Sequence, residues 1–318
     1  MAITYLCPVV NHSAGGIKVL YRHSEMLSAH GIDSCIFQPD NPAYSCTWFK
    51  HNAKLREAKP FNIQNDFVVV PEVWAASMGK QCLERNIKYA IFVQNAFLIR
   101  AGKNQNATEL KKIYQEADLI MSISEHTTEM ISLAYPNIQE NKIIRLLPNM
   151  GGNFTSGKKK KIISFMPRKL PDHAEMVYFL LKEHLPEDWS LVPVVNKSED
   201  EVANLLSESS IFLSFSDLEG FGLPPLEAAF CGNMVVGYTG QGGKEYFDPP
   251  VFHEVQNGDF VKYIEGVMEA IKKVDAGMLA SPVFTEQVER LKTKYSKENE
   301  LAHLLSFASR ASEILAEK

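Results

Sequence analysis

Short apolar runs alternate along the chain with longer segments that carry helical periodicity or polar turn chemistry. In the first half these runs fall at 3–10, 35–38, 67–71, 90–93, 119–123 and 143–147. Runs such as 67–71 and 90–93 are apolar at successive positions, which is typical of strands covered by helices on both faces. The pattern therefore predicts alternating strands and helices built around a parallel sheet.

A glycine-rich, polar stretch after Leu147 interrupts this rhythm, which restarts at Ile162. Further strands are expected at 162–166, 191–195, 211–215, 234–238 and 251–255, with helices such as 174–183 and 199–207 between them. From Phe284 onward we expect helix to the end of the chain, with an apolar stripe of Leu301, Leu304, Leu305 and Ile314. A length of 318 residues fits two α/β domains, which we place at 1–150 and 151–300.

Composition excludes several classes of protein. A net charge of −5 gives no general attraction to phosphates, so we expect no nucleic-acid partner and at most peripheral membrane contact. No apolar run approaches the ~18 residues that span a bilayer, and the N-terminus lacks the marks of a signal peptide. The five cysteines are widely spaced without a C-x-x-C pair, which indicates neither a disulfide framework nor a zinc site. These features favour a cytoplasmic protein.

A run of four lysines at 158–161 follows the expected domain boundary. It could be a local phosphate-binding patch, but a charge run beside a linker is more often solvated surface, and we favour that interpretation.

The segment after the strand expected at 211–215 carries the clearest chemistry. Ligands of parallel sheets bind outside the carboxyl ends of the strands. Here Gly220 and Gly222 form a turn, and the prolines that follow suit the first turn of a helix. The backbone N–H groups at that helix start can bind a phosphate or diphosphate. Glu219 and Glu227 flank the turn, and each carboxylate can accept hydrogen bonds from vicinal hydroxyls.

This segment, Glu219-Gly-Phe-Gly-Leu-Pro-Pro-Leu-Glu227, resembles the Glu-x7-Glu motif of the retaining GT-B glycosyltransferases of family 4. The glycine-rich stretch that ends at Glu245 and the Gly15-Gly16 pair after the first strand are also similar to that family. The resemblance implies a GT-B fold, in which two Rossmann-like parallel-sheet domains face each other across a cleft. The first domain would bind the acceptor and the second the nucleotide-sugar donor. It also implies that a final helix, 301–318, packs back on the N-terminal domain.

The resemblance further assigns roles to individual residues. Glu219 would bind the hydroxyls of the donor sugar and Glu227 the ribose. The diphosphate would lie against the backbone of Phe221, Gly222 and Leu223.

Two departures from the family pattern concern the remaining positions. Arg168 matches a diphosphate-binding arginine, but the usual lysine is replaced, and either Lys169 or His173 must substitute for it. Two cations there would stabilise charge on the leaving group. Where many relatives carry a histidine near the donor sugar, this chain has Gln94 and Asn95, and an amide cannot act as a general base. Gly15 and Gly16 would approach the diphosphate from the other domain.

The implied activity is transfer of a sugar from a nucleotide-diphosphate sugar to an acceptor hydroxyl with retention of configuration, as in polysaccharide biosynthesis. The acceptor could be a sugar, a glycan or a lipid-linked molecule, and the aromatic residues Trp48, Phe49 and Phe61 could contribute to its site. We expect no metal and no cofactor. Two alternatives stay open: a nucleotide-sugar epimerase or hydrolase on the same fold, and a catalytically silent nucleotide-sugar-binding subunit.

Overall fold

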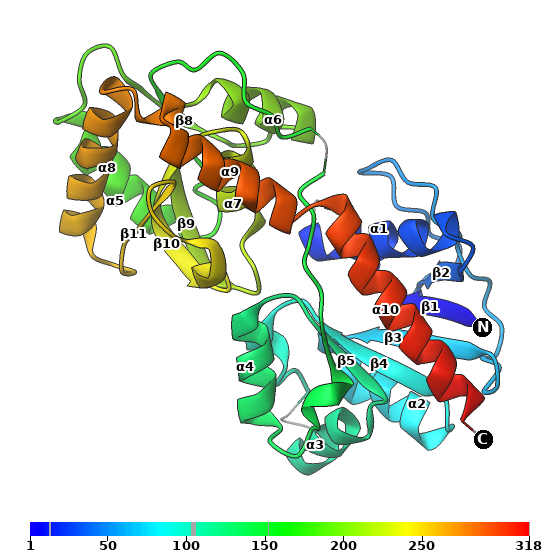
Figure 1. Ribbon diagram of the computed structural model, residues 1–318. Helices are drawn as coiled ribbons and strands as arrows, with labels where there is room; N and C mark the ends of the chain where they lie inside the picture. The colour runs from blue at the N-terminus through cyan, green and yellow to red at the C-terminus, as the bar shows by residue number, and fades with distance from the viewer. Residues whose placement is uncertain (13, 103–105, 152, 318) are drawn as a thin grey trace. The chain divides into compact units, whose positions relative to one another are not determined.

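Each half of the chain folds around one parallel sheet in the computed structural model, which describes residues 1–12, 14–102, 106–151 and 153–317. The chain divides into two units (Figure 1). Unit 1 contains Met1–Pro148 together with Glu298–Lys318, and unit 2 contains Asn149–Lys297. The boundaries expected from the sequence, after residues 150 and 300, lie a few residues further along the chain.

The sheet of unit 1 has six parallel strands in the order β2-β1-β3-β4-β5-β6. All six runs expected from the sequence form strands, at β1 (Ala2–Leu6), β2 (Asp33–Phe37), β3 (Asp66–Pro71), β4 (Lys88–Val93), β5 (Leu119–Ser122) and β6 (Ile143–Arg145). The chain leaves β1 toward β2 at one edge and then returns to place β3 on the other side of β1. The topological switch point therefore lies between β1 and β3.

Helices cover both faces of this sheet, as the uninterrupted apolar strands predict. In β3, Phe67 and Val69 belong to one core cluster and Val68 and Val70 to a second. The first cluster includes residues of α1 (Gly15–Ala29) and α10 (Lys297–Ala316). The second includes residues of α2 (Lys80–Glu84), α3 (Ala107–Glu116) and α4 (Glu125–Ala134).

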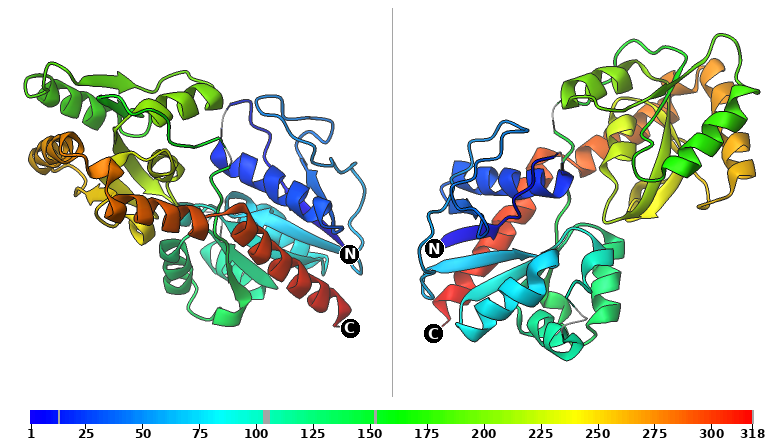
Figure 2. Two further views of the ribbon diagram at one scale, coloured as in Figure 1. Left: turned by 45° about the horizontal axis from the view of Figure 1, so that its top comes forward. Right: turned by 180° about the vertical axis from the view of Figure 1, so that it is seen from behind.

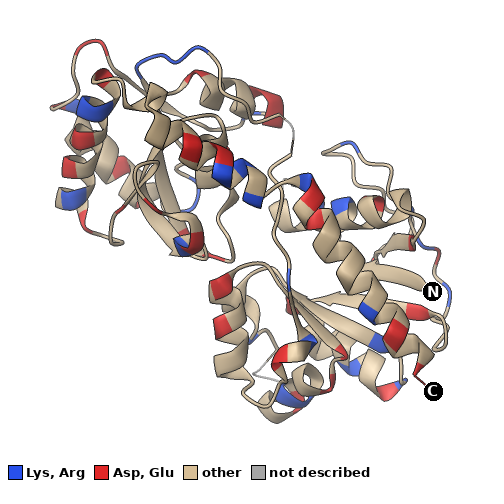
Figure 3. Cartoon of the chain, viewed as in Figure 1, with Lys and Arg blue, Asp and Glu red and all other residues tan. Residues whose placement is uncertain are grey.

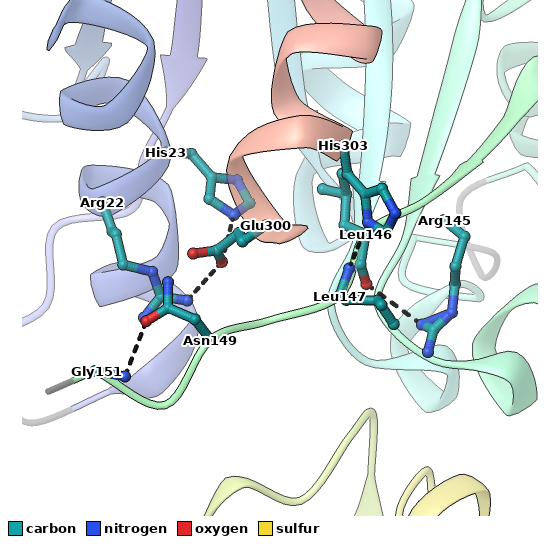
Figure 4. Close-up of polar contacts among 9 residues, drawn as sticks. All are labelled: Arg22, His23, Arg145, Leu146, Leu147, Asn149, Gly151, Glu300 and His303. Atoms are coloured by element: carbon teal, nitrogen blue, oxygen red, sulfur yellow. Dashed lines mark hydrogen bonds and ion pairs between the residues drawn. The ribbon is translucent and has the colours of Figure 1, made fainter. Parts of the chain in front are cut away.

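The C-terminal helix α10 runs along unit 1 on the same face as α1 (Figures 1 and 2). Phe307 of α10 meets Phe67 edge to face, with their ring centroids 5.8 Å apart. Glu300, which is fully buried, accepts hydrogen bonds from Arg22 at 2.7 Å and from the Nε2 of His23 at 3.2 Å, both on α1 (Figure 4).

The expectation of one helix from Phe284 to the end was wrong. The helix α9 (Pro282–Lys294) ends before Tyr295, and α10 begins at Lys297. Leu305 is also 37% exposed, so the apolar stripe was partly misplaced: Phe307, Ala308 and Ala311 lie in the core beside Leu304.

The sheet of unit 2 has five parallel strands in the order β11-β10-β9-β7-β8, so its switch point lies between β7 and β9. All five expected strands are present, at β7 (Ile162–Phe165), β8 (Ser190–Pro193), β9 (Ile211–Glu219), β10 (Met234–Gln241) and β11 (Phe252–Glu254). The helix α5 (Pro171–Lys182) packs against α8 (Phe260–Asp275), and α7 (Leu223–Phe230) packs against α6 (Glu199–Glu208) and α9.

Six short 3-10 or π segments complete the described structure: η1 (Glu72–Trp74), η2 (Ala75–Gly79), η3 (Ala96–Leu98), η4 (Glu140–Lys142), η5 (Lys244–Tyr246) and η6 (Met278–Ala280). Acidic and basic residues are interspersed over the helices and loops of each unit (Figure 3). Within the described ranges no helix is long and apolar enough to cross a membrane. The five cysteines are free thiols.

The lysine run at 158–161 is not simply solvated surface, and that interpretation was wrong for Lys159. The Lys159 ammonium donates hydrogen bonds to the carbonyl oxygens of Leu206, Ser209 and Cys231, at the carboxyl ends of α6 and α7. Burial lowers the pKa of Lys159 to about 8. A cation at helix C-termini satisfies carbonyl groups that have no partner within the helix. Lys159 therefore fixes the far end of α7.

Candidate active site

The strongest candidate site lies where β9 turns into α7 in unit 2. Gly222 is the residue before α7, with a φ of +83°, a conformation that favours glycine. Pro224 lies in the first turn of the helix, as the sequence predicts. The Phe221 side chain is 3% exposed and anchors the turn from beneath. The backbone N–H groups of Gly222 and Leu223 therefore lie at the carboxyl end of the sheet, whereas Pro224 and Pro225 have no N–H group.

Two non-glycine residues beside this turn adopt left-handed backbone conformations. Leu218 has a φ of +44° and Gln241 a φ of +71°. They lie on neighbouring strands, because Glu219 pairs with Gln241 across an irregularity in the β9–β10 ladder. Backbone conformations of this kind cost free energy and concentrate at binding and catalytic sites. The carboxylate of Glu219 thus stands at the end of a locally strained strand.

A lysine from the loop after the neighbouring strand β7 forms an ion pair with Glu219. Lys169 lies in the loop after β7, and its Nζ is 2.9 Å from the Glu219 Oε1. The Lys169 and Glu219 side chains are 45% and 23% exposed. Arg168 lies in the same loop and is exposed. Because β7 and β9 flank the switch point, these three residues converge where open α/β sheets bind ligands.

Lys169 and His173, the two candidates for the second cation, have different surroundings. The His173 Nδ1 lies 3.2 Å from the Tyr238 hydroxyl, and the ring meets Phe260 edge to face at 5.1 Å. His173 is therefore held in a side-chain cluster at the start of α5. Lys169, in contrast, is partly exposed and paired with a candidate site residue. The geometry favours Lys169 as the second cation beside Arg168.

Glu227 lies in α7, one turn from its start, and is partly buried. Glu219, Glu227 and Glu245 all raise the pKa of the buried Tyr246 hydroxyl, after burial itself as the larger cause. The charges of all three carboxylates therefore act on one residue that the sequence analysis did not single out. Its position directly after Glu245 was the available signal.

In unit 1, Gly15 and Gly16 are the first residues of α1, which has no side-chain cap at its start. A Cβ atom on Gly16 would lie 3.2 Å from the Gln94 Oε1. Glycine at this position therefore lets the Gln94 side chain approach the start of α1 closely.

Asn95 has a structural role that the sequence did not reveal. Its side-chain oxygen accepts a hydrogen bond from the Phe97 amide at 2.9 Å and caps η3. The backbone N–H of Asn95 donates a hydrogen bond to the Glu72 Oε1 at 2.9 Å. Glu72 is 4% exposed, and burial raises its pKa to about 7 against the opposing effect of three backbone hydrogen bonds. Sequence reasoning missed Glu72, although a carboxylate directly after a wholly apolar strand was a usable signal.

The aromatic residues Trp48, Phe49 and Phe61 are partly buried and pack against neighbouring residues. Trp48 donates its indole N–H to the Val10 carbonyl at 2.9 Å, and its ring centroid lies 4.6 Å from that of Phe49. Phe61 packs against Phe37 and Arg56. The Trp48 hydrogen bond joins its segment to the loop after β1. No group of three or more metal-binding side chains occurs among the residues that the structure describes.

Comparison with known proteins assigns part of unit 2. Residues 180–276 match the family model "Glycosyl transferases group 1". A stretch of 97 residues is 31% identical to an alpha-1,6-glucosyltransferase of Actinobacillus pleuropneumoniae serotype 7 (strain AP76). This stretch covers 30% of the chain and 29% of that enzyme.

The fold comparison covers the whole chain. Sucrose-phosphate synthase from Thermosynechococcus elongatus has a TM-score of 0.67 at 13% identity, with complete coverage of both chains. The Alr3699/HepE protein of Anabaena, solved with UDP-glucose, has a TM-score of 0.70 at 9% identity, again with complete coverage of both chains. The chain therefore has the GT-B fold.

The region matched by the group 1 glycosyl transferase model contains the turn, Glu219, Glu227 and Tyr246. Arg168 and Lys169 precede it, and no residue of unit 1 lies within it. The structure brings Lys169 to Glu219, while the candidate residues of unit 1 gather separately at the ends of β1, β3 and β4.

Proposed function

We propose that this chain transfers a sugar from a nucleotide-diphosphate sugar to an acceptor hydroxyl, with retention of configuration. The observation that carries the proposal is the Lys169–Glu219 pair at the switch point of unit 2, beside the start of α7. The group 1 match over the same turn supports it. The UDP-glucose complex of the Anabaena neighbour supports a nucleotide-sugar donor.

In this proposal the diphosphate lies against the amides of Phe221, Gly222 and Leu223. Helix N-termini favour anions because their N–H groups have no partner within the helix. Arg168 and Lys169 add positive charge from the neighbouring loop. An ion pair as exposed as Lys169–Glu219 contributes at most about 1 kcal/mol, so the lysine can exchange its carboxylate partner for a phosphate at little cost.

The two carboxylates bind the uncharged sugar and ribose of the donor. Once Lys169 turns to the diphosphate, the Glu219 oxygens can accept hydrogen bonds from sugar hydroxyls. Glu227 is assigned to the ribose. The contributions of Gly15, Gly16 and Asn95 in unit 1 rest on the resemblance alone, and Asn95 already caps η3 with its side-chain oxygen.

Retention follows from displacement on one face of the sugar. The bond between the anomeric carbon and the diphosphate oxygen breaks as the acceptor oxygen forms its bond from the same side. The acceptor's proton passes to the departing diphosphate oxygen, so no protein base is required. The amides at the start of α7, Arg168 and Lys169 stabilise the negative charge that develops on the diphosphate. Because these groups supply the positive charge, we propose that the reaction proceeds without a metal.

The test is incubation with UDP-, GDP-, ADP- and dTDP-sugars and mixed saccharide acceptors, with the products followed by NMR. We expect a glycoside with the donor's anomeric configuration, unchanged rates in EDTA, and loss of transfer in Glu219→Ala and Arg168→Ala variants that remain folded. Free sugar as the sole product would identify a hydrolase and an isomerised donor an epimerase. Binding without turnover would identify a silent subunit.

A further inference from the structure

Tyr246 contacts the back of the turn between β9 and α7. Its side chain is 2% exposed, and its hydroxyl lies 3.2 Å from the Phe221 carbonyl oxygen. The hydroxyl also donates a hydrogen bond to the Gly222 carbonyl oxygen. Tyr246 reaches the turn from the segment after β10, so this contact joins two loops that are 24 residues apart in sequence.

The approach of Tyr246 to the turn depends on glycine. A Cβ atom on Gly222 would lie 3.1 Å from the Tyr246 hydroxyl oxygen, and one on Gly243 would lie 3.0 Å from it. A Cβ atom on Gly242 would lie only 2.2 Å from the Gly220 carbonyl oxygen. The Gly242 amide also donates to the Glu219 carbonyl at 3.3 Å. The segment 242–246 therefore lies directly against the turn and meets its carbonyl groups.

Because the peptide bond is planar, this contact also fixes the direction of the neighbouring backbone N–H groups. In a planar trans peptide the C=O of one residue and the N–H of the next point in opposite directions. Holding the Phe221 carbonyl toward Tyr246 directs the Gly222 amide away from it. Holding the Gly222 carbonyl there directs the Leu223 amide away as well. These are two of the three amides assigned to the diphosphate.

We propose that Tyr246 is a positioning residue for the donor: its hydroxyl holds the Phe221 and Gly222 carbonyls so that the Gly222 and Leu223 amides face the diphosphate. This inference rests on the proposed function. The aromatic packing supports it, because the Phe221 ring lies 5.2 Å from Tyr246 and 5.3 Å from Tyr295, centroid to centroid. The turn is thus held by a hydrogen-bonding hydroxyl and by buried rings.

The hydroxyl remains a donor over the working pH range. Burial raises the pKa of Tyr246 well above 10, and the charges of Glu245, Glu219 and Glu227 raise it further. A phenolate, which would repel the two carbonyl oxygens, therefore does not form.

The chain offers a matched control for removing this hydroxyl. Tyr263 is fully buried in the same unit, and its hydroxyl likewise contacts two backbone carbonyls, those of Ser214 at 3.1 Å and Val236 at 3.2 Å. Tyr263→Phe removes the same chemistry away from the turn. The comparison therefore separates positioning of the turn from general loss of a buried hydrogen bond.

The experiment is calorimetric titration of wild type, Tyr246→Phe and Tyr263→Phe with UDP, GDP, ADP and dTDP, and with the matching nucleoside without phosphates. For the diphosphate that binds wild type, we expect Tyr246→Phe to raise the Kd about tenfold, the effect of one hydrogen bond of ordinary strength. The nucleoside should bind both variants as it binds wild type, within about twofold, and Tyr263→Phe should leave the diphosphate Kd unchanged.

An unchanged diphosphate Kd in Tyr246→Phe would overturn the inference, as would equal weakening of diphosphate and nucleoside. If wild type binds none of the four diphosphates, the proposed function itself fails. Should Tyr246→Phe not fold, amide hydrogen exchange of wild type decides instead. The bound diphosphate is expected to slow exchange at Gly222 and Leu223, and unaltered exchange at both would contradict the proposal.

Discussion

The buried carboxylate of Glu300 is expected to contribute a large part of the free energy that fixes α10 on unit 1. Burial alone would raise its pKa, but the hydrogen bond from His23, the Arg22 charge and the Arg22 hydrogen bond outweigh burial and lower the pKa to about 2. Burial lowers the pKa of His23, and the hydrogen bond and charge of Glu300 oppose this effect. A carboxylate pKa that falls from 4.5 to about 2 corresponds to roughly 3 kcal/mol of stability at neutral pH.

The perturbation is Glu300→Gln, which keeps the shape of the side chain and removes its charge. We expect the free energy of unfolding of unit 1 to fall by about 3 kcal/mol at pH 7. Because the folded-state pKa is depressed, this stability is present above pH 4.5 and is lost as the pH falls toward 2. The difference in free energy of unfolding between wild type and variant should therefore be smaller by roughly 1 kcal/mol at about pH 3.5 than at pH 7.

Urea titration followed by hydrogen-exchange mass spectrometry measures this effect, because peptides of units 1 and 2 report their unfolding separately. The control is Glu298→Gln, an exposed glutamate in the first turn of the same helix, with an expected change below about 0.5 kcal/mol. Equal stability of the two variants would refute the reasoning, and so would a gap that does not depend on pH.

Three further predictions concern Glu72 in unit 1 and Lys159 and Gly242 in unit 2. Because the pKa of Glu72 is raised to about 7, the free energy of unfolding of wild type should fall by up to about 3 kcal/mol as the pH rises from 4.5 through 7. Thermal melting of Glu72→Gln should not show this fall. Lys159→Met leaves buried carbonyls unpaired and should cost unit 2 about 2–4 kcal/mol in urea unfolding. Gly242→Ala forces a Cβ atom against the Gly220 carbonyl, and calorimetry should detect no nucleoside diphosphate binding.

Each of these three variants has a control variant in the same unit, at a residue that is exposed or distant from the contact tested. Glu84→Gln should keep the pH dependence of wild type, and Lys160→Met, whose lysine is 55% exposed, should cost under about 0.5 kcal/mol. Gly157→Ala should retain diphosphate binding. Equal behaviour of a variant and its counterpart would contradict the corresponding prediction.

The positions of the strands follow from local pattern, and the sequence was sufficient to predict them. Strands such as β3 and β4 are buried on both faces, so their side chains are apolar at successive positions from Phe67 to Pro71 and from Tyr89 to Val93. The observed β9 is longer than expected, because polar residues from Ser216 to Glu219 continue to pair with β10. The Glu219–Glu227 spacing was legible for a similar reason, since it lies within one strand–turn–helix segment.

Contacts between segments that are distant in sequence could not be predicted from the sequence pattern. Lys159 looked like part of a solvated charge run, because only the folded chain brings the ends of α6 and α7 to it. Tyr246 meets the turn through a hydroxyl that no periodicity marks. The break between α9 and α10 was missed because Tyr295 is apolar enough to continue the helical pattern, yet it packs beneath Phe221.

The most direct test of the central claim is the shift in melting temperature that UDP, GDP, ADP and dTDP produce in wild type and in Lys169→Met. A ligand that binds only the folded state raises its melting temperature. One diphosphate is expected to stabilise wild type and Lys182→Met, an exposed lysine of α5, but not Lys169→Met. No shift in wild type, or the same shift in Lys169→Met, would contradict the assignment of the diphosphate to the switch point of unit 2.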